Sequence, residues 1–162
     1  MNAIQRILII SVASALTPVV TQSAMGPVGD VFTLGGDLVG HQRNPELAFN
    51  ANGGFAVWEH VSKNSNGSRI LLQPLNVLMG QNGGPIRVSE STSRDDEARP
   101  HVAMLPNGGA VVVWEAGQRK SRNVFVRFLN ENGSPIGATQ VVNSFTRGNQ
   151  DRPKVAVNYK GD

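Results

Sequence analysis

The fold is decided by one stretch of the chain, Arg99-Pro100-His101-Val102-Ala103-Met104-Leu105-Pro106-Asn107-Gly108-Gly109-Ala110-Val111-Val112-Val113-Trp114-Glu115. From its proline on, the stretch occurs a second time, one residue shorter, from Pro45 to Glu59, and its opening residues occur a third time after Pro153. Recurrence at similar spacing is the signature of a repeat protein, in which one supersecondary unit is used several times.

Three prolines mark the repeat. Pro45, Pro100 and Pro153 are 55 and 53 residues apart, which gives a unit of about 54 residues. After each proline comes the same glycine position, and the first two units continue to a Trp-Glu pair, an apolar run and an Asn-Gly turn. The alignment predicts the tail of a preceding unit over residues 25–44, followed by repeats over 45–99 and 100–152 and the truncated start of a third repeat over 153–162.

Each unit is expected to hold four short strands. In the second unit, His101–Leu105 and Ala110–Glu115 flank an Asn-Gly-Gly hairpin turn, because Asn and Gly tolerate the positive φ of tight turns. We expect an irregular loop next, then a strand over Asn123–Asn130, a turn at Asn132-Gly133 and a fourth strand around Gln140–Asn143. Alternating apolar residues between Gly-rich turns, with no helical pattern after residue 24, predict an all-β chain.

A unit of about 50 residues with four antiparallel strands has the size of a β-propeller blade. A sheet this small cannot bury its faces alone, so blades stack and share a core. The run Val111-Val112-Val113-Trp114 suits a strand that is covered on both faces. The predicted fold is therefore a series of four-stranded antiparallel blades that forms an incomplete β-propeller of about 2.5 blades.

The repeat pattern runs Gln-x-x-Pro-x-Val-Ala, Asn-Gly-Gly, Val-Val-Val-Trp-Glu and Gly-x-Pro-Ile-Gly. With this pattern the chain resembles the propeller-like repeats of large secreted bacterial proteins, some of which also carry haemolysin-type calcium-binding or adhesin modules. The resemblance covers residues 26–162 and implies a scaffold. The Gly-Gly-x-Gly-x-Asp nonapeptide is absent from this sequence, so calcium binding of that kind is not implied.

A closed propeller needs about four to eight blades, more than these units supply. Three explanations stay open. We expect the chain to be a truncated frame or a fragment of a longer protein; alternatively, several copies assemble one ring, or the repeats pack as a small open sandwich. In a lone chain the strand expected over Lys154–Asn158 would present an exposed edge that favours self-association.

The N-terminus has the pattern of a secretory signal peptide. Arg6 precedes the apolar run Ile7–Leu16, and small residues follow up to Ala24. The run is shorter than the roughly 20 residues that span a bilayer. We expect residues 1–24 to be removed and the rest to be secreted or periplasmic; a buried N-terminal helix is the alternative. The chain has no cysteine, so no disulfide holds the fold together.

No residue pattern indicates catalysis. His41, His60 and His101 lack the spacing of metal ligands, and no phosphate loop, Ser-His-Asp set or nucleophilic cysteine is present. The net charge is +3, but the Lys and Arg residues are scattered, and the densest run, Arg119–Arg122, is expected to be a solvated loop rather than a nucleic-acid site. We therefore predict no enzyme, no metal, no cofactor, no nucleic-acid partner and no membrane span.

Two ligand-binding candidates each have a structural alternative. The acidic cluster Asp95-Asp96-Glu97 could bind a cation or a sugar, but the next unit has Gly148-Asn149-Gln150 there, which favours a solvated loop. Trp58 and Trp114 could stack on a sugar, but their recurrence inside apolar strands favours packing between blades.

Two polar columns recur before the prolines. We expect Gln42, Glu97 and Gln150 to hydrogen-bond neighbouring blades, and Arg94 and Arg147 to hold a neighbouring loop rather than an anionic ligand. The ligand-binding residues therefore stay unknown. The predicted function is a secreted scaffold for binding or adhesion, with a glycan or protein ligand. The alternatives are a fragment of a propeller-fold carbohydrate-active enzyme and a purely structural spacer.

Overall fold

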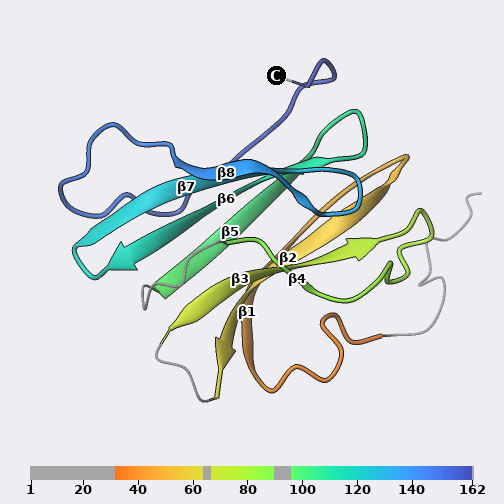
Figure 1. The fold of residues 1–162 in the computed structure, drawn as a ribbon, viewed down its shortest axis with the longest axis horizontal. Helices are drawn as coiled ribbons and strands as arrows, with labels where there is room; N and C mark the ends of the chain where they lie inside the picture. The colour runs from red at the N-terminus through yellow and green to blue at the C-terminus, as the bar shows by residue number, and fades with distance from the viewer. Residues whose placement is uncertain (1–31, 64–66, 90–95, 162) are drawn as a thin grey trace, which may run out of the picture. The chain divides into compact units, whose positions relative to one another are not determined.

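The computed structural model describes residues 32–63, 67–89 and 96–161, which form two four-stranded antiparallel sheets (Figure 1). In each sheet the strands pair in the order in which they follow along the chain. The first sheet, blade 1, contains β1 (Gly40–Asn50), β2 (Gly53–Ser62), β3 (Ser68–Leu75) and β4 (Ile86–Arg87). The second sheet, blade 2, contains β5 (Asp96–Met104), β6 (Ala110–Gln118), β7 (Ser121–Leu129) and β8 (Pro135–Val141).

The prediction of an all-β chain of four-stranded antiparallel blades is confirmed. Within the described ranges no residue belongs to a helix long and apolar enough to cross a membrane. The predicted signal peptide, residues 1–24, lies outside the described residues, as do Arg94 and Asp95. The boundaries between the repeat units stay a prediction.

The hairpin turn of the deciding stretch forms as its sequence predicts. Leu105 N donates to Gly109 O at 2.8 Å, and Gly108 N donates to Leu105 O at 3.1 Å. Gly108 has a φ of +89°, a left-handed conformation that glycine adopts without a steric penalty. The side chain of Asn107 accepts a hydrogen bond from Gly109 N and closes the turn.

Two connections in blade 2 are tighter than expected. A two-residue hairpin, Arg119-Lys120, replaces the irregular loop, because β6 and β7 stay paired up to Gln118 and Ser121. The fourth strand begins at Pro135 rather than near Gln140. The side chain of Asn130 accepts hydrogen bonds from the backbone of Asn132 and Ser134, so the chain turns back at once.

The first strand of each blade carries a β-bulge just before its proline. The pairing register shifts between Arg43 and Glu46 in β1 and between Ala98 and His101 in β5. Pairing therefore continues beyond the bulge, and β5 begins at Asp96 rather than at His101. A bulge bends a strand and redirects side chains, so the residues at this end of the first strands point differently from those beyond the proline.

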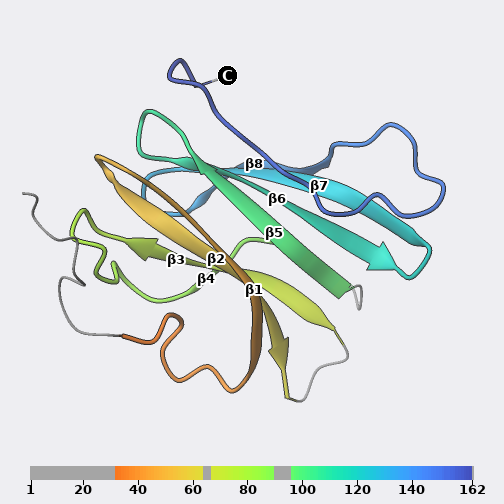
Figure 2. The ribbon, with the colours of Figure 1, turned by 180° about the vertical axis from the view of Figure 1, so that it is seen from behind.

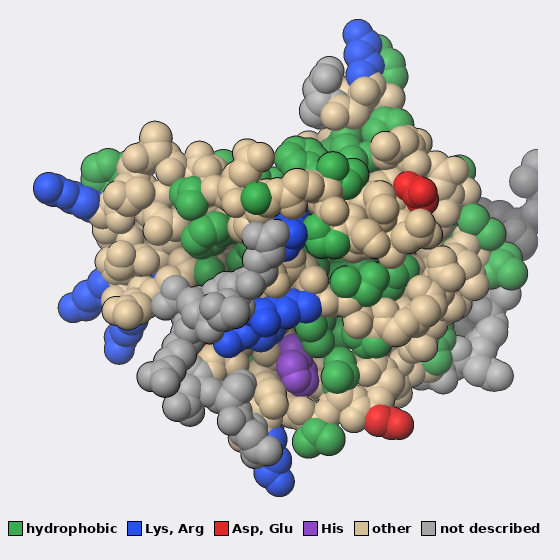
Figure 3. Space-filling model, in the orientation of Figure 1, with side chains coloured by type: hydrophobic (Ala, Val, Ile, Leu, Met, Phe, Trp, Pro, Cys, Tyr) green, Lys and Arg blue, Asp and Glu red, His purple; other side chains and the backbone are tan. Residues whose placement is uncertain are grey.

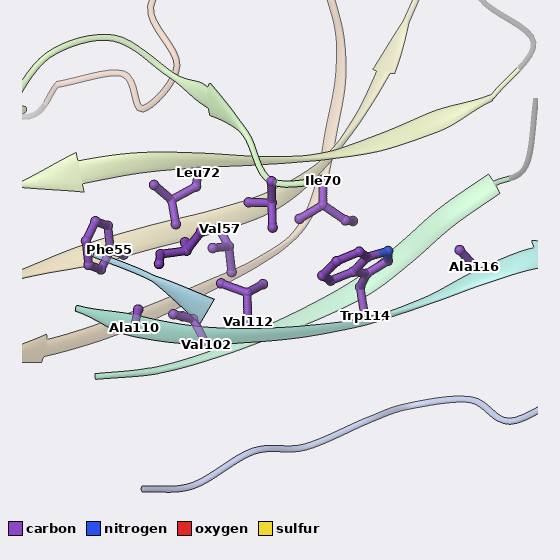
Figure 4. Packing of buried hydrophobic residues seen from close by; sticks show 11 residues of the cluster. Phe55, Val57, Ile70, Leu72, Val102, Ala110, Val112, Trp114 and Ala116 are labelled. Atoms are coloured by element: carbon purple, nitrogen blue, oxygen red, sulfur yellow. The ribbon is translucent and has the colours of Figure 1, made fainter. Parts of the chain in front are cut away.

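The core lies between the two blades. Phe55, Val57, Ile70 and Leu72 of blade 1 face Val102, Ala110, Val112 and Trp114 of blade 2 (Figure 4). The Trp114 ring stacks on Phe125 with the ring centroids 6.0 Å apart. Each such buried side chain contributes on the order of 1.5–3 kcal/mol to stability. The shared core confirms that neighbouring repeats cover each other's faces, as expected for propeller blades.

Residues 153–158 lie against blade 2 without pairing into either sheet. Val155 N donates a hydrogen bond to His101 Nδ1 at 3.3 Å. Farther along, Gly161 N donates to Asn158 O at 3.0 Å, which repeats the turn bond between Gly108 and Leu105. The segment thus follows the repeated proline as β1 and β5 do, and its bond to His101 places it beside β5 (Figures 1 and 2).

Candidate functional site

A polar cleft of about 530 Å³ opens at the end of the sheets where β1 and β5 begin and where β2 and β6 end. In Figure 1 the arrowheads of β2 and β6 lie at this end. Side chains of both blades line the cleft, and most of them are charged. The charged residues are four arginines, Arg43, Arg99, Arg119 and Arg122, and four acids, Glu59, Asp96, Glu115 and Asp151.

A buried carboxylate, Glu115, forms the floor of the cleft on the side of blade 2. Only 1% of its side chain is exposed. Its Oε1 accepts hydrogen bonds from Arg99 Nη1 at 2.8 Å and from Arg122 Nη1 at 2.9 Å, and its Oε2 accepts one from Arg152 N at 2.8 Å. A buried charge is stable only when it is paired and hydrogen-bonded. Glu115 is therefore a structural clamp that ties blade 2 to the segment that follows it.

The equivalent residue of blade 1, Glu59, is also buried, with 7% of the residue exposed. Its Oε2 accepts a hydrogen bond from Asn44 Nδ2 at 2.9 Å. Among the described residues, none forms an ion pair with Glu59. Glu59 lines the cleft and also an adjoining cavity of about 400 Å³.

A second groove, of about 360 Å³, lies beside the cleft where the first strands of successive units meet. Three residues there, Asn44, Arg99 and Arg152, each precede a proline and have φ values of 49°, 48° and 52°. Left-handed backbone outside glycine is uncommon, costs about 1–3 kcal/mol per residue and concentrates at functional sites. The groove is bridged by Lys154 Nζ and Glu46 Oε1, which are 3.2 Å apart.

His101 lies near this groove, on β5. Burial and the neighbouring Lys154 lower the pKa of His101 below its usual 6.5, while Glu46 opposes the shift. The ring accepts a hydrogen bond from Val155 N through Nδ1, which requires that nitrogen to be unprotonated. The neutral form of His101 therefore holds the segment that follows blade 2. Neither His60 nor His41 shares this setting, since His60 pairs with Gln42 and His41 is exposed.

The described residues of the acidic cluster, Asp96 and Glu97, do not form one solvated loop. The Asp96 side chain is 60% exposed, lines the cleft and lies 4.0 Å from Arg122 Nη2. Glu97 is buried and accepts hydrogen bonds from Ile70 N, at 3.1 Å, and from the Ser89 hydroxyl. Within the described ranges no group of three or more His, Asp or Glu side chains could hold a metal ion.

The polar columns are only partly as expected. Glu97 hydrogen-bonds the neighbouring blade, but Gln42 donates to Leu38 O within its own region. Gln150 reaches blade 2 through its backbone, whose N–H donates to Arg122 O. Arg147 is exposed, and its backbone oxygen accepts a hydrogen bond from the Gln150 side chain.

Two of the sequence candidates are buried and one prediction is corrected. Trp58 and Trp114 are both buried, but of the two Trp114 alone belongs to the core between the described blades, whereas Trp58 lines an apolar cavity of about 350 Å³. The run Arg119–Arg122 is not a purely solvated loop, because Arg122 turns inward to the buried Glu115. Neither glutamate of the Trp-Glu pairs was predicted as a site residue. The signal that could have identified them is a charged residue that recurs at the end of an apolar strand.

No family model and no curated protein matches the sequence. Among solved structures, the chain is similar to an α-L-arabinanase of Penicillium chrysogenum complexed with arabinobiose, at 24% sequence identity and a TM-score of 0.51. The likeness covers 72% of this chain and 36% of the arabinanase, so the chain spans about a third of that protein. The arabinanase is a β-propeller, and the likeness supports a propeller-like fold for this chain.

This likeness corrects one prediction. We expected the chain not to be an enzyme, because no catalytic pattern stood out in its sequence. The similar propeller is itself a glycoside hydrolase, which overturns that exclusion. A fold can bring together acids from separate strands, so a catalytic site needs no fixed residue spacing along the chain. The likeness does not support the predicted relationship to haemolysin-type or adhesin-associated repeats specifically.

Proposed function

We propose that this chain supplies two blades of a propeller-fold carbohydrate-active enzyme and that its polar cleft is a saccharide site. The observation that carries the proposal is the fold likeness to an arabinanase complexed with arabinobiose. Closing the ring needs further blades, on the same polypeptide or on partner chains. A cleft between the blades, at one end of the sheets, is a favoured place for a ligand site.

The side chains of the cleft support a saccharide ligand. Sugar hydroxyls donate and accept hydrogen bonds, and the cleft offers arginine and asparagine donors beside carboxylate acceptors. Glycoside hydrolysis commonly uses two carboxylates that flank the bond to be broken. Glu59 and Asp96 both line the cleft and the adjoining cavity. Glu115 is excluded from such a role because two arginines neutralise it.

Calorimetric titration with a panel of neutral oligosaccharides, arabinobiose included, tests the proposal. We expect saturable binding by the intact chain. No binding to any member of the panel would contradict the proposal. A reducing-sugar assay on the same panel then separates an enzyme, which releases new reducing ends, from a scaffold for binding or adhesion, which binds without turnover.

Export to the cell exterior is also proposed, from the signal pattern in residues 1–24. A cleaved form with its new N-terminus near Ala24, found outside the cytoplasm of a bacterial host, is the expected result. An uncleaved chain that stays in the cytoplasm would contradict it.

A further inference from the structure

The two Trp-Glu pairs place equivalent carboxylates at the ends of β2 and β6, but their surroundings differ. On the third strands, Glu59 pairs with Ile70 and Glu115 with Val124. On the first strands, Glu59 pairs with Arg43 and Glu115 with Ala98. This shared register makes the two blades directly comparable, residue by residue. Differences around the glutamates therefore come from the substituted side chains and not from a different fold.

Both cations that clamp Glu115 are replaced in blade 1. Arg99, the bulge residue before Pro100, corresponds to Asn44 before Pro45. Arg122 lies two residues before Val124, and the residue two before Ile70 is Ser68. The Ser68 hydroxyl donates to Glu97 O at 2.6 Å and so turns toward blade 2.

Among the described residues no guanidinium group bonds Glu59 in their place, although Arg43, its cross-strand partner on β1, lines the cleft beside it. Glu59 borders both the cleft and the adjoining cavity, and Ser68 lines that cavity. A carboxylate offers about four lone-pair positions, and among the described residues only Asn44 donates to Glu59. A buried charge with few hydrogen bonds is destabilising, so acceptor positions on Glu59 are available to a ligand.

We infer that Glu59 binds the hydroxyl groups of a neutral saccharide in the cleft. This inference rests on the proposed function, and it makes Glu59 the principal hydrogen-bond acceptor of the saccharide site. Two adjacent hydroxyls can donate to the two oxygens of one carboxylate, and such charge-assisted bonds are the strong ones. A sugar acid is disfavoured at Glu59 itself, because the Glu59 charge would repel a second carboxylate placed against it.

Titration of arabinobiose into three variants tests the assignment. Glu59→Gln keeps the shape of the side chain but removes its charge, and should weaken binding about tenfold or more. Asn44→Arg installs the clamp of blade 2 on blade 1; it should abolish binding while the circular dichroism spectrum stays that of the unaltered chain. Glu131→Gln, in the turn after β7, removes the same charge at the opposite end and should bind as the unaltered chain does.

The outcomes distinguish the role of Glu59 from the presence of a saccharide site. If the unaltered chain binds arabinobiose and Glu59→Gln or Asn44→Arg binds it equally well, the role of Glu59 is overturned and the saccharide site stands. If the unaltered chain does not bind arabinobiose, the assigned ligand and the role of Glu59 fall together. Equal weakening by Glu131→Gln would show a general charge effect and would also overturn the assignment.

Discussion

At the scale of single residues, the Trp-Glu pairs show one motif in two environments. Glu115 is held by two arginines and a backbone N–H, whereas Glu59 is held by one asparagine. The first arrangement stabilises the fold. The second leaves a buried hydrogen-bond acceptor on the wall of a cleft. This lowers the stability of the fold but leaves acceptor positions for a ligand.

Glu115→Gln should destabilise the chain by about 3 kcal/mol, because it leaves Arg122 partly buried beside a group that no longer neutralises it. Glu59→Gln should cost less than about 1 kcal/mol, since the amide still accepts from Asn44 and no cation is stranded. Urea unfolding measures both. Equal losses for the two variants would contradict the distinction between clamp and binding residue.

Stability should also depend on His101. Because its pKa is lowered in the folded chain, the unfolded chain binds more protons as the pH falls. The stabilisation is therefore complete above the unfolded pKa of about 6.5 and is lost as the pH falls through the lower, folded value. Urea unfolding between about pH 8 and pH 5 should show this decrease.

His101→Asn is the matched control, because its amide oxygen can accept from Val155 N and does not titrate. Its stability should change less over the same pH range. An identical pH dependence in the variant would assign the decrease to other groups.

Some residue-scale features could be predicted from sequence and others could not. The turn at Asn107-Gly108 was predictable because these residue types favour positive φ. Arg99 was not, since arginine rarely adopts this conformation and here its ion pair comes from Glu115, 16 residues away. The cleft could not be predicted either, because its lining residues come from strands that are far apart in the sequence.

At the scale of elements, the strands follow the alternation of apolar residues, but their ends follow tertiary contacts. The predicted strand over Ala110–Glu115 extends to Gln118, because β6 keeps its pairing with β7 through a two-residue hairpin. Glycine is needed near that hairpin: Gly117 has a φ of +126°, and a Cβ there would lie 2.5 Å from Ser121 O. Such close approaches depend on the partner strand and were not predictable from one segment.

The two tryptophans give a test of the shared core. Trp114 packs between the blades, whereas Trp58 faces an apolar cavity of about 350 Å³ on the other side of blade 1. Trp114→Ala should therefore cost about 3–5 kcal/mol, and Trp58→Ala about 2 kcal/mol, because Trp58 lies outside the core cluster and borders a cavity. Thermal or urea unfolding compares them. A larger loss for Trp58→Ala would contradict the placement of the core.

At the scale of the whole molecule, the described blades leave apolar faces uncovered. Val102 of blade 2 is 5% exposed at the interface between the blades, whereas Leu47, its equivalent in blade 1, is 51% exposed. At the other side, Phe128 and Ile136 of blade 2 are exposed, and hydrophobic side chains reach the surface among polar ones in Figure 3. Since neighbouring blades bury these positions in the repeat, both faces are suited to further blades.

The architecture was thus the feature that the sequence predicted best, because the residue pattern of one repeat unit recurs several times along the chain. The function was the least predictable feature, because the residues that line the cleft come singly from both blades. Aligning the repeats nevertheless makes their differences informative: Asn44 and Ser68 stand where blade 2 has arginines, and this marks the cleft. The comparison needed the strand register, which only the structure supplies.

The most direct test of the saccharide site is a titration of the ¹⁵N-labelled chain with arabinobiose, followed by amide chemical shifts in NMR spectra. The account predicts saturable shifts at the cleft, around Arg43, Glu59 and Asp96. The turns at the opposite end of the sheets, at Asn52-Gly53 and Asn107-Gly108, should not move. An absence of shifts, or shifts confined to those turns, would contradict the claim that this cleft binds a saccharide.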